Sequence, residues 1–144
     1  MTEEERLARA VQLVVDDLLV RGQPAESIGV RIVSESPAAS LRRGIAILEN
    51  GRYWIVELSG FTGRMEIPLD IKAPEELWKY RVADVLQDIV DEESCEPRPV
   101  CPSHYHPLSP RWEEGVACWV CPTIPSLRCA MGTYWTWRTN ARMP

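Results

Sequence analysis

Two short Cys/His pairs, separated by thirteen residues, constrain this chain more than any other feature of its sequence. His104 follows Cys101, and Cys121 follows Cys118, each after two residues, which gives the pattern C-x2-H-x13-C-x2-C. Each pair fits a tight turn, and the stretch between them is long enough for a β-hairpin that brings the turns together. Thiolates and imidazole suit Zn²⁺, and four of them complete its tetrahedron. The sequence therefore predicts a structural zinc site in a small zinc-ribbon-like β module.

The choice of the four ligands stays open, because all five cysteines and both histidines lie between residues 95 and 129. His106 lies two residues after His104, so in an extended segment it shares the same face and can replace it. Cys118 falls where a strand is expected, and a small thiol in a strand is often a core residue. In that case His106 or Cys129 becomes the fourth ligand, and Cys95 is a further alternate.

The number of cysteines helps to predict the cellular compartment in which the protein works. Five is an odd count, and the chain begins Met-Thr-Glu-Glu-Glu, which is unlike the basic opening of a secretory signal. An odd, clustered set favours a metal or free thiols over a disulfide framework. We therefore expect a cytoplasmic protein with no membrane span. Buried free thiols and disulfides are the alternatives to a metal.

A second pattern overlaps the first. From Cys118 the sequence reads C-x2-C-P-x6-C, followed by Gly132-Thr133-Tyr134-Trp135. This resembles the cysteine signature of WhiB-like iron–sulfur regulators, which have a distant first cysteine, a C-x2-C-P pair, a fourth cysteine and a later glycine–tryptophan turn. The resemblance covers only residues 118–135. It implies a four-cysteine cluster, in which Cys95 or Cys101 joins Cys118, Cys121 and Cys129.

The chain divides near Ser94. Residues 1–94 hold 11 basic and 18 acidic residues, a net charge of −7, whereas residues 95–144 hold five arginines and three glutamates, a net charge of +2. The second part also contains eight of the twelve prolines. A segment of this size and composition does not build a core unaided, so a metal would supply part of its folding free energy. We expect an acidic module over residues 1–94 and a Cys/His-rich, Pro/Trp-rich β module over residues 95–144.

Hydrophobic periodicity predicts two helices in the acidic module. The first runs over residues 3–21, with Thr2 as N-cap, Glu5 completing a capping box and Gly22 as the C′ residue. The second runs over residues 74–93. The apolar stripes expected to face the core are Leu7, Val11, Val14, Val15 and Leu18 in the first helix, and Trp78, Val82, Val85, Leu86 and Ile89 in the second.

Strands are predicted over residues 28–33 and 64–69, and a hairpin over residues 43–58 is centred on Asn50-Gly51, a strong turn signal. In that hairpin Leu48 faces Tyr53, Ile47 faces Trp54 and Ala46 faces Ile55. The resulting fold class is α+β, an antiparallel meander sheet with both helices on one face. In the second module we expect strands over residues 108–112 and 116–120, joined by a turn at Glu113-Glu114-Gly115.

The predicted function is that of a zinc-binding interaction or regulatory adaptor with a protein partner. No nucleophile–base pair and no phosphate-binding glycine loop is present in the sequence, so no enzyme activity is predicted. A nucleic-acid-binding regulator is the alternative, because exposed aromatics beside arginines can stack bases. The tail Tyr134-Trp135-Thr136-Trp137-Arg138 alternates aromatic and polar residues, which predicts a β-rich segment. The expected partner-binding residues are Trp112, Trp119, Tyr134, Trp135 and Trp137.

Overall fold

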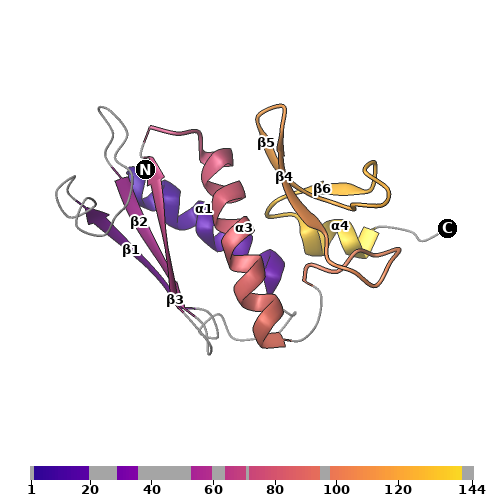
Figure 1. The fold of residues 1–144 in the computed structure, drawn as a ribbon. Coiled ribbons are helices and arrows are strands. Elements are labelled where there is room, and N and C mark those ends of the chain that lie inside the picture. Colours follow the sequence, from indigo (N-terminus) through magenta and orange to yellow (C-terminus); the bar gives the residue numbers. More distant parts are fainter. Residues whose placement is uncertain are drawn as a thin grey trace.

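The structure, a computed structural model, describes residues 2–19, 29–35, 53–59, 64–70, 72–94 and 98–140. Within these residues, two three-stranded antiparallel sheets lie on opposite sides of a pair of long helices (Figure 1). The sheet β1-β2-β3 lies on one side of α1 and α3, and the sheet β4-β5-β6 lies with the short helix α4 on the other. This arrangement confirms the α+β class. No helix in the described ranges is long and apolar enough to cross a bilayer.

The first helix, α1 (Glu3–Leu18), begins as predicted. The Thr2 side chain accepts a hydrogen bond from the Glu5 N–H, and the Glu5 side chain accepts one from the Thr2 N–H, which completes the capping box. The helix ends three residues before the predicted boundary, because Leu19 has an extended backbone with ψ of 143°. Gly22, the predicted C′ residue, lies outside the described residues. The predicted apolar stripe is buried throughout: Leu7, Val11, Val14, Val15 and Leu18.

The second long helix, α3 (Glu75–Ser94), matches its predicted range to within one residue. Trp78, Val82 and Leu86 are buried as predicted, and Val85 is half-buried against the same core. The side chain of Ile89 lies outside the described part. Figure 1 shows that α1 and α3 pack side by side and cover one face of the first sheet, as the meander architecture requires.

The first sheet contains β1 (Gly29–Glu35), β2 (Tyr53–Ser59) and β3 (Arg64–Asp70), in that order. Tyr53 pairs with Glu35 on one side and with Asp70 on the other. Both edges of β2 are therefore occupied along its length, which leaves no edge for the predicted pairing with residues 46–48. Those residues and the Asn50-Gly51 turn lie outside the described residues.

The second sheet contains the predicted hairpin of β4 (Ser109–Glu113) and β5 (Val116–Val120), with β6 (Arg128–Ala130) added beside β5. The hairpin loop is Glu114-Gly115, with φ of 53° and 77°. Positive φ at both central residues is typical of the type I′ turn that suits the twist of a two-residue hairpin. Strand β6 was not predicted, since only three residues form it.

The prediction of a β-rich tail was wrong. Residues Tyr134–Asn140 form a helix, α4, and the first backbone N–H of that helix is bound by the Asp17 carboxylate of α1. The Trp135 indole also donates to the Asp16 carbonyl oxygen at 2.9 Å. Contacts with a distant helix therefore override the local alternation of aromatic and polar residues. These contacts pack the tail against α1 in the first part of the chain.

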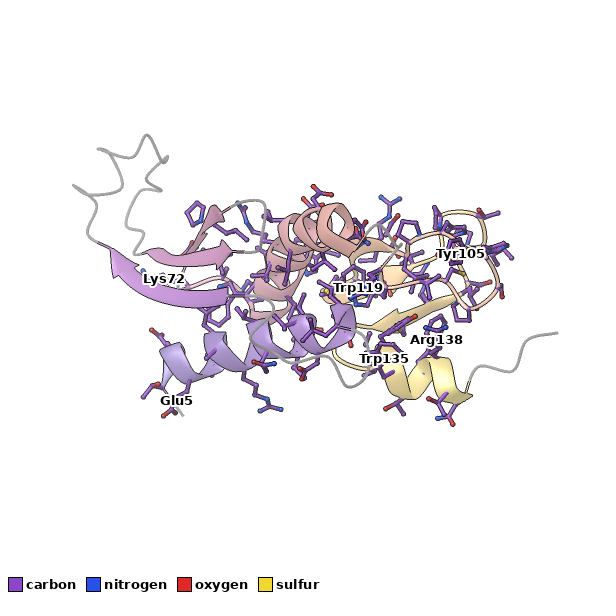
Figure 2. The ribbon with its side chains drawn as sticks, turned by 90° about the horizontal axis from the view of Figure 1, so that it is seen from below. Glu5, Lys72, Tyr105, Trp119, Trp135 and Arg138 are labelled. Carbon is purple, nitrogen blue, oxygen red and sulfur yellow. The ribbon has the colours of Figure 1, made fainter. Side chains whose placement is uncertain are left out.

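One hydrophobic core spans both parts of the chain. Its buried members include residues of α1, α3 and β3 as well as Leu108, Trp119 and Met131 from the Cys/His-rich part. Figure 2 shows Trp119 between the two helices and the second sheet. The boundary at Ser94 thus separates two compositions, whereas the side chains from both sides of it pack into a common interior.

Candidate metal centre

Four side chains converge beside the β4–β5 hairpin. Cys101, His104, His106 and Cys121 each offer one ligand atom, and these atoms all lie within 4.8 Å of one another. The Nδ1 atom of His104 is 3.5 Å from the sulfur of Cys101 and 3.5 Å from that of Cys121. The Nε2 atom of His106 is 3.8 Å from the Cys121 sulfur. Two sulfur and two imidazole donors at these separations can hold a metal ion.

A closed loop presents three of the four ligands. Val100 and Pro107 form an isolated antiparallel bridge, and the Cys101 N–H donates to the His106 carbonyl oxygen at 2.9 Å. These bonds close residues 100–107 into a compact turn. Because Ser109 of β4 pairs with Val120 of β5, the start of this hairpin lies next to its end. The loop before β4 is thereby brought against Cys121, which directly follows β5.

Backbone N–H groups surround both sulfurs. The Ile124 N–H donates to the Cys121 sulfur at 3.3 Å. Burial alone would raise the pKa of the Cys121 thiol, but donation from the Ile124 and Thr123 N–H groups and from the Cys101 thiol makes that pKa lower than usual. Hydrogen bonds to the charged form stabilise a thiolate, and the thiolate is the form that binds metals.

The environment of the Cys101 sulfur is different. Burial is the main reason that its pKa is raised, and the neighbouring Cys121 sulfur raises it further. The backbone N–H groups of Ser103 and His104 act in the opposite direction. Two sulfurs this close share one proton more easily than they carry two negative charges, and a cation between them would favour both thiolates.

The two imidazole rings are stacked, with centroids 4.9 Å apart and an angle of 14° between their planes. The Nδ1 atom of His106 lies 3.0 Å from the carbonyl oxygen of Pro107. A carbonyl oxygen only accepts, so Nδ1 carries the proton and the Nε2 lone pair faces the cluster. A backbone partner of this kind commonly fixes the tautomer and orientation of a metal-binding histidine.

The structure brings together three of the four residues that were the first choice, Cys101, His104 and Cys121, and adds the alternate His106. It does not bring Cys118 into this cluster. Cys118 lies in β5 opposite Ala130 of β6, where its thiol is buried. Residues at i and i+3 of an extended segment point to opposite faces, so Cys118 and Cys121 do not converge. The strand that the sequence predicted here is the physical reason for this correction.

The other cysteines do not join the cluster in the described part of the chain. Cys129 pairs with Trp119 across β5 and β6, so it faces the shared core. Burial there raises the pKa of Cys129 to about 12, which keeps it a thiol. Cys95 lies outside the described residues. Because adjacent positions alternate between faces, Cys118 and Cys129 point away from each other, and the structure gives no support to the four-cysteine iron–sulfur arrangement.

The predicted partner-binding aromatics have different environments. Trp119 and Tyr134 are 0% and 1% exposed, so they belong to the core and are not available to a partner. Trp135 and Trp137 are half-buried and pack against that core. Trp112 of β4 is 44% exposed, which makes it the most exposed member of the predicted set.

Comparison with protein-family models, with curated proteins and with solved structures gave no match to this chain. The functional inference therefore rests on the chemistry of the site itself.

Proposed function

We propose that Cys101, His104, His106 and Cys121 bind one zinc ion, which stabilises a zinc-ribbon-like module of an interaction or regulatory adaptor. The observation that supports this most directly is the convergence of the four ligand atoms within 4.8 Å. They come from the loop before β4 and from the end of β5, two segments that only a folded hairpin brings together.

The separations between donor atoms suit zinc. A tetrahedral Zn²⁺ with Zn–S of about 2.3 Å and Zn–N of about 2.05 Å has sulfur–nitrogen separations of about 3.5 Å. The Nδ1 atom of His104 meets this value with both sulfurs, at 3.5 Å each, and the pair formed by His106 and Cys121 is at 3.8 Å. Mixed thiolate and imidazole donors favour Zn²⁺ over hard cations such as Mg²⁺ or Ca²⁺.

We assign the ion a structural role, not a catalytic one. Catalytic zinc sites keep three protein ligands and one position for water, whereas four protein ligands close the tetrahedron. Both histidines of the chain lie in the cluster, so no further imidazole remains as a general base. Metal binding would stabilise the loop of residues 100–107 and its contact with Cys121.

A protein partner is favoured by the outer edge of the second sheet. Strand β4 pairs with β5 on one side, and no strand in the described ranges pairs with its other side. The exposed Trp112 ring projects from this strand. Open strand edges and exposed tryptophans are typical of protein-binding surfaces. Thiolate ligands also require a reducing compartment, so we propose the cytoplasm as the working location.

Elemental analysis of the full chain, purified without added metal, tests the site. We expect one zinc per chain, retained by Cys118→Ser and lost by Cys121→Ser. The two variants make the same replacement at buried thiols three residues apart, of which only Cys121 lies in the cluster. Iron with a visible chromophore, or equal metal loss in both variants, would overturn the assignment.

A second experiment tests the adaptor role. The tagged full chain and two variants, Trp112→Ser and Ile124→Ser, are used to recover bound proteins from the cells that express it. Both residues are similarly exposed, at 44% and 43%. We expect a protein that is retained by Ile124→Ser and lost by Trp112→Ser at unchanged zinc content. Salt-dependent binding of nucleic acid with no such protein would favour the nucleic-acid regulator instead.

A further inference from the structure

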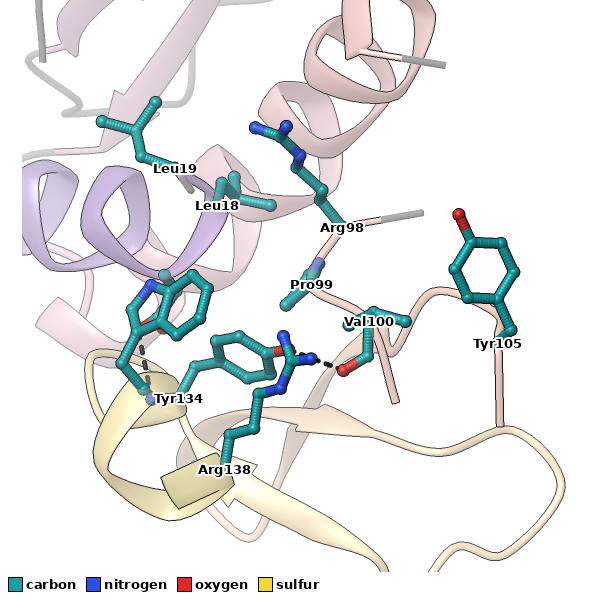
Figure 3. Close-up of a pocket in the computed structure, with 10 residues that line it drawn as sticks. Leu18, Leu19, Arg98, Pro99, Val100, Tyr105, Tyr134 and Arg138 are labelled. Atoms are coloured by element: carbon teal, nitrogen blue, oxygen red, sulfur yellow. Dashed lines mark hydrogen bonds between the residues drawn. The ribbon is translucent and has the colours of Figure 1, made fainter. Parts of the chain in front are cut away.

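A pocket of about 270 Å³ lies where the end of α1, the segment that begins at Arg98 and α4 meet (Figure 3). Much of its wall is apolar and comes from Leu18 and Leu19 at the end of α1, Pro99, and the ring of Trp135. An enclosed cavity of about 150 Å³ is enough to hold benzene, so this volume accommodates one substituted ring.

Arg138 from α4 gives this pocket a positive charge. Its guanidinium lies over the rings of Tyr134 and Trp135, at 6.0 and 5.6 Å from their centroids, and donates to the Tyr134 hydroxyl oxygen at 3.1 Å. That hydroxyl in turn donates to the Val100 carbonyl oxygen at 2.7 Å, so its orientation is fixed. Among the described residues, Arg138 forms no ion pair with a carboxylate. A guanidinium carries five N–H donors, so most of them remain for a ligand.

Asp17 also lines the pocket, but its carboxylate is already bound. The Trp119 indole and the Gly132 N–H donate to its Oδ2 atom, and the Tyr134 N–H donates to Oδ1. The residue is only 2% exposed. Because this carboxylate already accepts three N–H groups, it offers little to a cation in the pocket, whereas the Arg138 guanidinium presents N–H donors to it. The pocket therefore favours an anion.

We propose that this pocket binds a small organic anion, consisting of one apolar ring that carries a carboxylate or a phosphate group. The ring would lie between Leu18 and Trp135, and the oxyanion would accept hydrogen bonds from Arg138. A planar guanidinium matches both carboxylate and phosphate, since each offers two oxygens to its fork. The inference is independent of the zinc proposal, because none of these contacts involves a cluster ligand.

Four probes with the same ring and different head groups test the charge requirement: phenylacetate, phenyl phosphate, phenylacetamide and phenethylamine. Isothermal titration calorimetry on the full chain, as purified, is expected to show binding of the two anions and little of the amide or the amine. Tighter binding of phenyl phosphate would identify phosphate as the natural group, and tighter binding of phenylacetate a carboxylate. The proposal would be overturned if phenylacetamide bound as tightly as the anions, or if neither anion bound at millimolar concentration.

The role of the guanidinium is tested by Arg138→Gln, with Arg111→Gln as the matched control. Arg111 is an exposed arginine of β4 that does not line the pocket. We expect Arg138→Gln to weaken the binding of the anions by about tenfold or more, because a hydrogen bond to a charged group is lost. We expect Arg111→Gln to have little effect on their affinity. An unfolding temperature equal to the parent's shows that each variant keeps its fold. Unchanged anion affinity in a folded Arg138→Gln protein would refute the site.

Discussion

Asp17 of α1 and Trp119 of β5, 102 residues apart in the sequence, are joined by a hydrogen bond of 2.9 Å inside the core. The same carboxylate accepts the backbone N–H groups of Gly132 and Tyr134. One buried side chain thus connects the first helix to the second sheet and to the start of α4. Buried polar groups with several partners are costly to disrupt, which makes Asp17 a test of how the two parts of the chain depend on each other.

Replacing Asp17 by Asn should destabilise the protein by about 1–3 kcal/mol at neutral pH. The Asn amide offers one oxygen in place of two, so its NH2 group faces an N–H donor and leaves that donor unpaired. Urea denaturation monitored by tryptophan fluorescence measures the loss. An unchanged midpoint would contradict the connecting role of this carboxylate.

The same variant should alter the dependence of stability on pH. Burial is the main reason that the pKa of Asp17 is raised from 3.8 to about 6, although its three N–H partners act against the shift. A raised pKa means that the folded state binds the proton more tightly than the unfolded state. The stabilisation that the folded state gains by binding this proton is fully present below pH 3.8. It is lost as the pH rises through about 6.

This pH effect amounts to about 3 kcal/mol by linkage. Asp91, whose pKa burial also raises to about 6, contributes with the same sign in the parent and in Asp17→Asn. The difference between the two proteins therefore isolates Asp17. Denaturation of both at pH 4 and pH 7 should show a smaller pH-dependent change in the variant, and an identical change would contradict the raised pKa.

Gly132→Ala should destabilise the fold more than Gly115→Ala. Both glycines have positive φ, at 95° and 77°, so each replacement strains the backbone. A Cβ at Gly132 would also lie 3.1 Å from the Cδ2 atom of Leu13, whereas a Cβ at Gly115 meets nothing within 4 Å. Thermal unfolding of the two variants measures the additional destabilisation that the Leu13 contact causes. An equal loss of stability in both would show that the Leu13 side chain moves aside at no cost.

His106→Ala should weaken metal binding while Tyr105→Ala leaves it unchanged. The two residues are adjacent in the same loop, but Tyr105 is 81% exposed and only His106 directs a nitrogen at the cluster. Removing a direct ligand should cost more than the roughly 10–100-fold expected when an outer partner of a ligand is lost. Competition with a chromophoric chelator measures the affinity. Equal affinity in the two variants would exclude His106 from the ligand set.

Removing the metal with a chelator should lower the unfolding temperature, because an ion that binds only the folded state stabilises it. The division of the sequence at Ser94 predicts that residues 95–144 lose structure while residues 1–94 remain largely folded. The shared core predicts in addition a change in the environment of Trp119. Near-ultraviolet circular dichroism reports the aromatic environment and the far ultraviolet reports the helices, and an unchanged unfolding temperature would contradict the structural role.

Local sequence patterns were sufficient to predict those parts of the structure that neighbouring residues determine. The capping box at Thr2 and the hairpin turn depend on contacts within a few residues, and the sequence predicted both, although the turn was predicted as Glu113-Glu114-Gly115 and Glu113 belongs to β4. The apolar stripe of α1 was predicted from the spacing of its residues. The cluster was predicted in part. The strand expected at Cys118 was the signal that replaced this residue by His106 or Cys129, of which the structure places His106 in the cluster, whereas the spacing of the cysteine pair favoured Cys118.

The helix α4 could not be inferred in the same way. The Asp17 carboxylate that binds its first N–H is 117 residues away, and no short window of sequence contains both groups. Thr133 was an overlooked local signal. Its carbonyl oxygen accepts the first bond of the helix, from the Trp137 N–H, and threonine is a favoured residue at that position.

The long separation between Asp17 and its donors has a consequence during synthesis. The Asp17 carboxylate is synthesised first, and Trp119, Gly132 and Tyr134 follow it by 102, 115 and 117 residues. Until those residues emerge, α1 carries an acidic group whose enclosed site does not yet exist. This part of the interior can therefore form only after α4 has been synthesised and has packed against α1.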